Sequence, residues 1–267
     1  MIYSPVDHDR TSREVERQIE SLVLEGVLRA GDRLPGERDL SKSLNVSRPI
    51  LRQALDTLVE RSLLTVRHGG GTFVADVTGT VFDKSVVELI GQNARAKSDY
   101  LEYRREIEGM AASMAAQRAT EPDKQLLKRI IADMKTAHLK NDTQRGSALD
   151  VEFHSTVGEC AHNIILLHTL RSCYQLLTDD VFFNRQLIFK NAEEKMRDML
   201  LDQHVQICDS ILAGDADGAE RNARDHITFV EAVTRKAELK NEWNSVAKLR
   251  FEQREDRVSK KRKTRKS

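Results

Sequence analysis

The sequence has few residues that interrupt helices. It contains only 13 glycines and 4 prolines in 267 residues, and aromatic side chains make up 5% of it. Charged residues, by contrast, make up 32%. A chain with few helix breakers and many charges is typical of a mostly helical protein, and we expect one here.

Long apolar runs and a targeting segment are also missing. No stretch of about 18 apolar residues occurs, which excludes a membrane-spanning helix. The first ten residues, MIYSPVDHDR, lack the apolar core of a signal peptide. We therefore expect a cytoplasmic protein with no membrane partner.

Cysteine is scarce, and charge of neither sign dominates. The three cysteines, Cys160, Cys173 and Cys208, lie in helical patterns without CxxC spacing. We expect them to be buried, reduced thiols with no metal or redox role. The formal net charge is +1, so any nucleic-acid site must be a local patch of the surface.

The first 76 residues change from a helical to a β period. They open with TSRE, a capping-box pattern at residues 11–14, followed by apolar residues at helical spacing. LPGERDLSKSL predicts a second short helix, and SRPILRQALDTLVE predicts a third with Ser47 as its N-cap. LLTVRHGGGTFVAD is typical of two short strands around three glycines. Three helices followed by a hairpin predict a winged helix-turn-helix domain over residues 1–76.

The remainder of the chain is interpreted as a linker, a helical bundle and a tail. Residues 77–97 are assigned to a linker and a connecting helix. Residues 98–240 show helical periodicity with breaks at ATEPDK, LKNDTQRG, CAHN and LAGDADG, which predicts a bundle of about six helices. Residues 241–267 are assigned to the end of the last helix and a disordered basic tail, SKKRKTRKS. The predicted fold class is mostly α, with an N-terminal winged helix-turn-helix and a C-terminal all-α bundle.

The second helix of a helix-turn-helix enters the major groove of DNA. Here it begins with SRPILRQ, in which Arg48 and Arg52 are four residues apart and share one face. Arginine can donate two hydrogen bonds to guanine. Arg38 in the preceding helix and His68 at the glycine-rich tip are placed to reach DNA as well. The net charge of this domain does not by itself indicate DNA binding, because residues 1–76 hold 11 basic and 12 acidic residues.

The stretch LPGERDLSKSLNVSRPILRQALDTLVERSLLTVRHGGGTFV resembles the DNA-binding domain of the GntR family of bacterial transcription regulators. The resemblance implies a homodimer that binds a short inverted repeat in double-stranded DNA. It also differs from the family pattern at Gly36, at Pro49-Ile50 and at Gln53, positions that bear on phosphate contact. The DNA contacts that it implies are Arg38, Ser47, Arg48, Arg52, His68 and Gly69.

A candidate metal site lies in the helical half. Asp150 and His154 are separated by one helical turn and share a face. His204 and His226 each lie about ten residues from the AGDADG turn, so two antiparallel helices would bring them side by side. One carboxylate and three imidazoles suit a divalent metal, Zn²⁺ first and Ni²⁺ or Mn²⁺ as alternatives. A lone aspartate–histidine pair is more often an ordinary surface pair, so the site depends on all four residues.

The helical half resembles the ligand-binding domain called FCD, found in the FadR-like branch of the family. DYLEYRREIEGMAASMAAQRAT, DVEFHSTVGECAHNIILLHTL and DQHVQICDSILAGDADGAERNARDHI carry the resemblance. Other stretches, such as AHNIILLHTLR, resemble the pyruvate-responsive regulators of that branch, whereas its lactate- and glycolate-responsive regulators carry the metal pattern. The resemblance implies a small organic acid effector such as pyruvate, lactate or glycolate, with Arg104 and Asn163 among its contacts.

These observations favour a transcriptional regulator, a repressor of carbon and organic-acid metabolism, and not an enzyme. Two alternatives remain open. The metal ion itself could be the signal, which makes the protein a metal-sensing regulator. A metal-bound water could also be acidified, which would make the bundle a metal-dependent enzyme with a DNA-binding module. No separately placed general base accompanies the four candidate ligands, and this argues against the enzyme.

Overall fold

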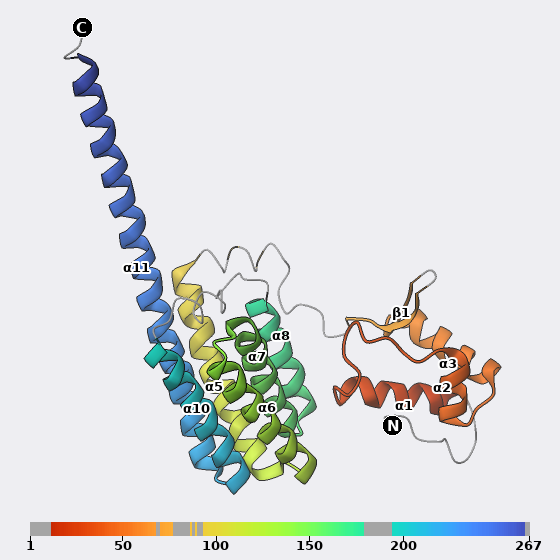
Figure 1. Cartoon of the computed structure of the whole chain (residues 1–267). Helices are drawn as coiled ribbons and strands as arrows, with labels where there is room; N and C mark the ends of the chain where they lie inside the picture. The colour runs from red at the N-terminus through yellow and green to blue at the C-terminus, as the bar shows by residue number, and fades with distance from the viewer. Residues whose placement is uncertain are drawn as a thin grey trace.

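The computed structural model describes residues 12–67, 70–76, 86, 89, 93–178 and 194–264. Figure 1 shows a small N-terminal domain of short helices with a two-stranded sheet, and a larger domain of long helices. The predicted fold class is therefore confirmed. In the described part of the chain, no helix is long and apolar enough to cross a membrane.

The N-terminal domain contains three helices and a hairpin. These elements are α1 (Ser12–Leu24), α2 (Glu37–Leu44), α3 (Arg48–Glu60), β1 (Leu64–Arg67) and β2 (Gly71–Val74). Leucines and valines from all of them form one buried cluster. The strands are antiparallel and in register from the Leu64–Val74 pair to the Arg67–Gly71 pair, which makes the predicted wing.

The turn between α2 and α3 sets the angle of the third helix. Asn45 ends α2 in the left-handed conformation, with φ 53°, and α3 begins three residues later at Arg48. Asparagine adopts this conformation more readily than most residues do, so a turn can close there without glycine. Ser47 occupies the N-cap position, as predicted, but its hydroxyl makes no capping hydrogen bond. The capping box predicted at Thr11 lies outside the described residues.

The C-terminal domain is a bundle of long helices. They are α5 (Ala94–Arg118), α6 (Glu121–Leu139), α7 (Thr143–Cys160), α8 (Ile164–Thr178), α10 (Glu194–Ala213) and α11 (Ala216–Thr264). Helix α5 lies along α11, and α6 lies along α7. Thr120 and Asp123 form a capping box at the start of α6, which fixes where that helix begins.

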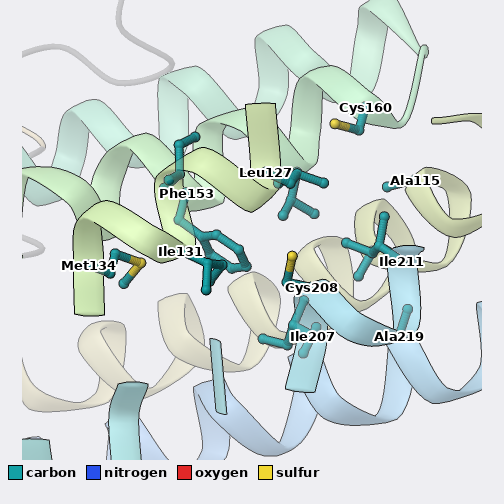
Figure 2. Packing of buried hydrophobic residues seen from close by; sticks show 14 of the residues in the cluster. Ala115, Leu127, Ile131, Met134, Phe153, Cys160, Ile207, Cys208, Ile211 and Ala219 are labelled. Atoms are coloured by element: carbon teal, nitrogen blue, oxygen red, sulfur yellow. The ribbon is translucent and has the colours of Figure 1, made fainter. Parts of the chain in front are cut away.

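The core of the bundle is aliphatic and lies between α6, α7 and α10. Figure 2 shows Leu127 and Ile131 of α6 beside Phe153 of α7 and Ile207 of α10. Small residues complete this core where α5 and α11 approach it, among them Ala115. Helix α7 also buries the polar side chains of Asp150 and His154. Buried polar groups need polar partners, so other polar side chains must lie next to them.

The C-terminal segment differs from its prediction. Helix α11 continues to Thr264, so most of SKKRKTRKS is helical and not disordered, and residues 265–267 lie outside the described part. Lysine and arginine are good helix formers, and no glycine or proline interrupts the run. A high charge by itself therefore did not end the helix.

The three cysteines are free and buried, as predicted. Burial raises the pKa of the Cys160 thiol to about 12, and it raises those of Cys173 and Cys208 to about 11. A thiol that stays protonated at neutral pH is a poor nucleophile and a poor metal ligand. These residues therefore act as small apolar side chains.

Leu127→Ala should destabilise the bundle, because this fully buried side chain fills the centre of the aliphatic core. We expect the free energy of unfolding in urea to fall by about 2–5 kcal/mol. Leu139→Ala is the matched control, since Leu139 is at the end of the same helix and is 84% exposed. Equal effects of the two substitutions would show that the core is misassigned.

Candidate functional site

Four of the six predicted DNA contacts lie in the described part of the chain, on an exposed face formed by α2 and the start of α3. Arg38, Arg48 and Arg52 are all exposed, and they lie on α2 and at the start of α3. Ser47 is exposed beside them, and its hydroxyl is not used to cap α3. Proline at the start of α3 needs no hydrogen bond there. This face thus offers exposed guanidinium groups and a hydroxyl that does not cap the helix.

Arg52 is held by one partner. Its guanidinium donates to Glu37 Oε2 at 2.7 Å, and this hydrogen bond raises the pKa of Arg52. Both side chains are largely exposed, so the ion pair contributes little to stability. Arg52 can therefore exchange Glu37 for a base edge at low cost.

The wing adds a basic residue next to this face. The Arg67 guanidinium lies 4.4 Å from the centroid of the Phe73 ring across the hairpin, a cation–π contact that orients it. His68 and Gly69, the two wing contacts implied by the sequence, lie outside the described residues.

The four candidate metal ligands meet inside the helical domain. Asp150 and His154 come from α7, His204 from α10 and His226 from α11, and each offers a ligand atom within 4.8 Å of the others. His204 Nε2 lies 3.2 Å from Asp150 Oδ1 and 3.3 Å from His154 Nε2. The four residues are between 1% and 7% exposed. The structure thus brings together residues as far apart as 76 positions in the sequence.

Each imidazole is oriented by an acceptor at its other nitrogen. His154 Nδ1 lies 2.7 Å from Glu108 Oε2, His204 Nδ1 lies 2.7 Å from the Leu200 carbonyl, and His226 Nδ1 lies 3.0 Å from Gln203 Oε1. A neutral imidazole that donates through Nδ1 keeps a lone pair at Nε2. Metal-binding histidines in proteins are usually held in this way.

The facing lone pairs test whether the donor set fits a cation. With Nδ1 donating, the Nε2 lone pairs of His154 and His204 point at each other and at the Asp150 carboxylate. Buried acceptors that face only acceptors are unfavourable unless a proton or a cation lies between them. A divalent cation bound by three nitrogens and one oxygen would satisfy all four, and Zn²⁺ prefers this donor set.

Burial disfavours the charged form of two of these histidines, His154 and His226. It is the largest cause of the lowered pKa of His154, which Glu108 opposes. Burial also lowers the pKa of His226 well below its usual value, and the neighbouring His204 and His154 lower it further. Imidazoles must be neutral to bind a metal, so these directions favour ligation over protonation.

Glu108 is a functional residue that the sequence analysis did not select. Burial alone would raise its pKa, but Arg104 and then His154 lower it well below the usual range. Arg104 donates to the other carboxylate oxygen, one turn earlier on α5. The four-residue spacing of Arg104 and Glu108 was the available signal. No sequence pattern indicated the role of Gln203, because glutamine is common on the exposed faces of helices.

The two predicted effector contacts lie in different places. Arg104 is buried beside the cluster, paired with Glu108 and 5.7 Å from the centroid of the Tyr174 ring. Asn163 caps α8 instead, because its Oδ1 accepts from the Leu166 amide at 3.1 Å. Arg104 and Asn163 both stay predicted effector contacts, and Asn163 also caps a helix.

Two cavities adjoin the cluster. A small one is lined by Glu108, His154 and Tyr174 together with apolar side chains. A second, of about 40 Å³, is lined by His204, Arg197 and apolar side chains, together with the polar residues His138, Asn141, Asp142 and Thr143. Arg197 Nε is buried and has no hydrogen-bond partner among the described residues. Arg197 is therefore a second candidate for an anion contact, and the sequence analysis missed it.

Zinc should stabilise the wild-type protein through this cluster. At a free metal concentration about 100 times Kd, the expected gain is about 2.7 kcal/mol, which in a chain of this size raises Tm by roughly 5–10 °C. His204→Ala should abolish the shift measured by calorimetry. His138→Ala is the control, since His138 contacts Asp198 outside the cluster. A shift retained in His204→Ala would refute the site.

Both domains match families of known proteins. Residues 11–74 match the family model "Bacterial regulatory proteins, gntR family", and residues 99–229 match the FCD domain. A protein assigned to regulation of the L-lactate dehydrogenase operon of Escherichia coli (strain K12) is 36% identical, over 85% of this chain and 87% of its own length. The Glc operon transcriptional activator of the same organism is 29% identical over 84% and 89%.

A solved structure agrees with this assignment. The Streptococcus agalactiae GntR structure superposes with a TM-score of 0.51 at 28% identity, covering 82% of this chain and 98% of that one. These families and relatives are transcription regulators and not enzymes. The chain belongs to the gntR family of bacterial transcription regulators and carries an FCD domain as its helical half.

Proposed function

We propose that this protein is a cytoplasmic, homodimeric repressor of genes for organic-acid metabolism, controlled by a small carboxylate bound at a metal-containing pocket. The observation that carries the proposal is the buried set of Asp150, His154, His204 and His226, with an acceptor at every Nδ1. The Nε2 atoms of His154 and His204 lie 3.3 Å apart, and two buried acceptors that face each other are costly unless a proton or a cation lies between them.

DNA is the partner of the N-terminal domain, as its family membership indicates. In the proposed complex, Arg48 and Arg52 read base edges in the major groove, while Arg38 and Ser47 contact the backbone. His68 and Gly69 complete the contact from the wing. Two such domains in a dimer would read a short inverted repeat.

The effector is proposed to be a small organic acid. A bound divalent metal, Zn²⁺ first and Ni²⁺ or Mn²⁺ next, would supply a Lewis-acid position for a carboxylate oxygen. The cavity beside Glu108, His154 and Tyr174 gives such an acid a place close to the cluster. Arg104 lies at this side, and its guanidinium would pair with a carboxylate if Glu108 turned wholly towards His154.

The relatives narrow the choice of acid. One is assigned to an L-lactate dehydrogenase operon, and others regulate different operons. We therefore place lactate first, with glycolate and pyruvate as the alternatives. All three are short carboxylates with an oxygen on the adjacent carbon, which suits two-point binding to a metal.

The coupling between the two sites sets the size of the response. An effector that binds one arrangement of the dimer better than the other lowers operator affinity by the same factor. Typical coupling is about 1–3 kcal/mol, or about 5- to 150-fold in affinity. A change of that size is enough to switch transcription.

A second candidate function is metal sensing, in which the ion alone is the signal. The observation that favours it is the ion pair between Arg104 and Glu108, which already satisfies the buried guanidinium. While Arg104 is paired with Glu108, its positive charge is less available to bind the carboxylate of an organic acid. Operator affinity that follows zinc concentration without any organic acid would favour this candidate.

A thermal-shift screen tests the proposed effector class. Purified protein of measured metal content is titrated with lactate, glycolate and pyruvate, with and without zinc. We expect one acid to raise Tm only in the metal-loaded protein, and we expect that shift to disappear in Arg104→Ala. Arg197→Ala is the matched arginine variant at the other cavity. If Arg197→Ala alone removes the shift, the acid binds on that side of His204; if no acid shifts any form, the effector proposal is wrong.

Arg52→Ala should weaken operator binding by about 5- to 150-fold, because one bidentate base contact is lost. Fluorescence anisotropy on an inverted-repeat operator measures the change. Arg61→Ala removes the same charge from the other end of α3, where Arg61 pairs with Glu20, and should have little effect. An Arg52→Ala protein that binds as tightly as wild type would exclude α3 as the reading helix.

A further inference from the structure

The helical domain contacts the DNA-binding domain at one polar patch. The loop that follows α1 lies against the end of α7 and one face of α8. Glu159 of α7 accepts hydrogen bonds at the same oxygen from Arg29, at 2.6 Å, and from Arg171 of α8, at 2.9 Å. Glu159 thus joins one arginine from each domain.

Two further hydrogen bonds hold the backbone of that loop. Arg171 donates to the Gly26 carbonyl at 3.2 Å, and His168 Nε2 donates to the Leu24 carbonyl at 2.9 Å. His168 Nδ1 is buried without a hydrogen-bond partner in the described part of the chain, so Nε2 is the nitrogen this histidine uses. The patch therefore binds both the Arg29 side chain and two backbone carbonyls of the loop.

The loop approaches the Arg171 guanidinium most closely at Gly26. Gly26 has φ +72°, and a Cβ there would lie 2.4 Å from the Arg171 guanidinium. Gly31, in the same loop, also has a positive φ, of +86°, but a Cβ there would meet nothing within 4 Å. Positive φ explains a glycine at either position. Only at Gly26 would a Cβ also require a side chain of the other domain, that of Arg171, to move.

One helix carries both this patch and part of the metal cluster. Glu159 follows His154 by five residues and Asp150 by nine on α7. A helix in a packed core moves as a rigid unit, so a shift of its ligand-bearing turns also moves Glu159. Glu159 and Arg171 are about one-fifth exposed, so water weakens their pairing less than it would at the open surface.

We propose that this patch, formed by Glu159, His168 and Arg171, is a docking surface for the chain's own DNA-binding domain, and that occupancy of the metal cluster decides whether the domain is docked. The second half of this inference rests on the proposed function. The contacts of the docking surface are few and polar, which is typical of an interface between domains that can separate. Docking fixes the orientation of α3, and release frees it.

The docking surface is tested with a cross-link that does not touch the four contacts. Leu24 is exposed at the end of α1 and Ile165 is exposed on α8, three residues before His168, so both can be replaced by cysteine and joined with a short bismaleimide. The native cysteines are buried with raised pKa values, so they compete little. We expect a high yield of intramolecular cross-link within one chain. Leu24→Cys with Leu139→Cys is the control pair and should not cross-link.

Substitutions at the patch then give the decisive comparison. In the cross-linking background, Gly26→Ala and Glu159→Gln should lower the yield several-fold. Gly31→Ala has the same positive φ without the contact, and Glu152→Gln removes an exposed carboxylate from the same helix, so both should leave the yield unchanged. A yield that falls equally in Gly26→Ala and Gly31→Ala would overturn the docking surface, because backbone strain alone would then explain it.

The link to the cluster is measured as the ratio of operator Kd values with and without zinc and lactate. In wild type and in both controls we expect a ratio of about 5 to 150. In Gly26→Ala and Glu159→Gln the ratio should fall towards 1. A wild-type ratio in these two variants would overturn the coupling. A ratio of 1 in wild type itself would instead refute the proposed function, while the cross-link still decides the docking.

Discussion

The buried carboxylate of Glu108 is the group on which the site depends. It binds the Arg104 guanidinium with one oxygen and the Nδ1–H of His154 with the other. A charge at this depth is stable only because both oxygens have partners. Through His154 it fixes which imidazole nitrogen faces the cluster, and through Arg104 it leaves one positive group beside the site. The orientation of His154 and the local charge thus follow from one residue.

The bundle supplies the rigidity that this arrangement needs. Phe153 packs edge-on against both His154 and His204, with ring centroids 5.5 Å and 5.0 Å away, so the apolar core fixes two of the ligands directly. The third, His226, reaches the cluster from α11, whose contact with α5 is extensive. Separate helices therefore hold the four donors, and relative movement of those helices would alter the site. This is the physical property that a sensor requires.

Much of this could be predicted from the sequence, where local spacing carries the information. The leucine stripe of α3 and the glycines of the wing predicted the DNA-binding domain, and the four-residue spacing of Asp150 and His154 predicted half of the cluster. The placement of His204 and His226 on either side of one turn predicted the other half. Each of these signals comes from the period of a helix or the chemistry of a turn.

Contacts between distant segments could not be predicted in this way. Nothing in the spacing indicates that the Leu200 carbonyl and Gln203 orient two histidines, or that Glu159 meets Arg29 across 130 residues. The length of α11 was also missed, because charge composition does not mark where a helix ends. The capping hydrogen bond of Asn163 at the start of α8 was not predicted either.

The central claim is that three imidazoles and one carboxylate of this chain bind a divalent metal. X-ray absorption spectroscopy at the zinc edge of the metal-loaded protein measures those ligands directly. The account predicts three imidazole nitrogens, with oxygen in the remaining positions, and no sulfur. Fewer than three imidazoles, or any sulfur at about 2.3 Å, would contradict it.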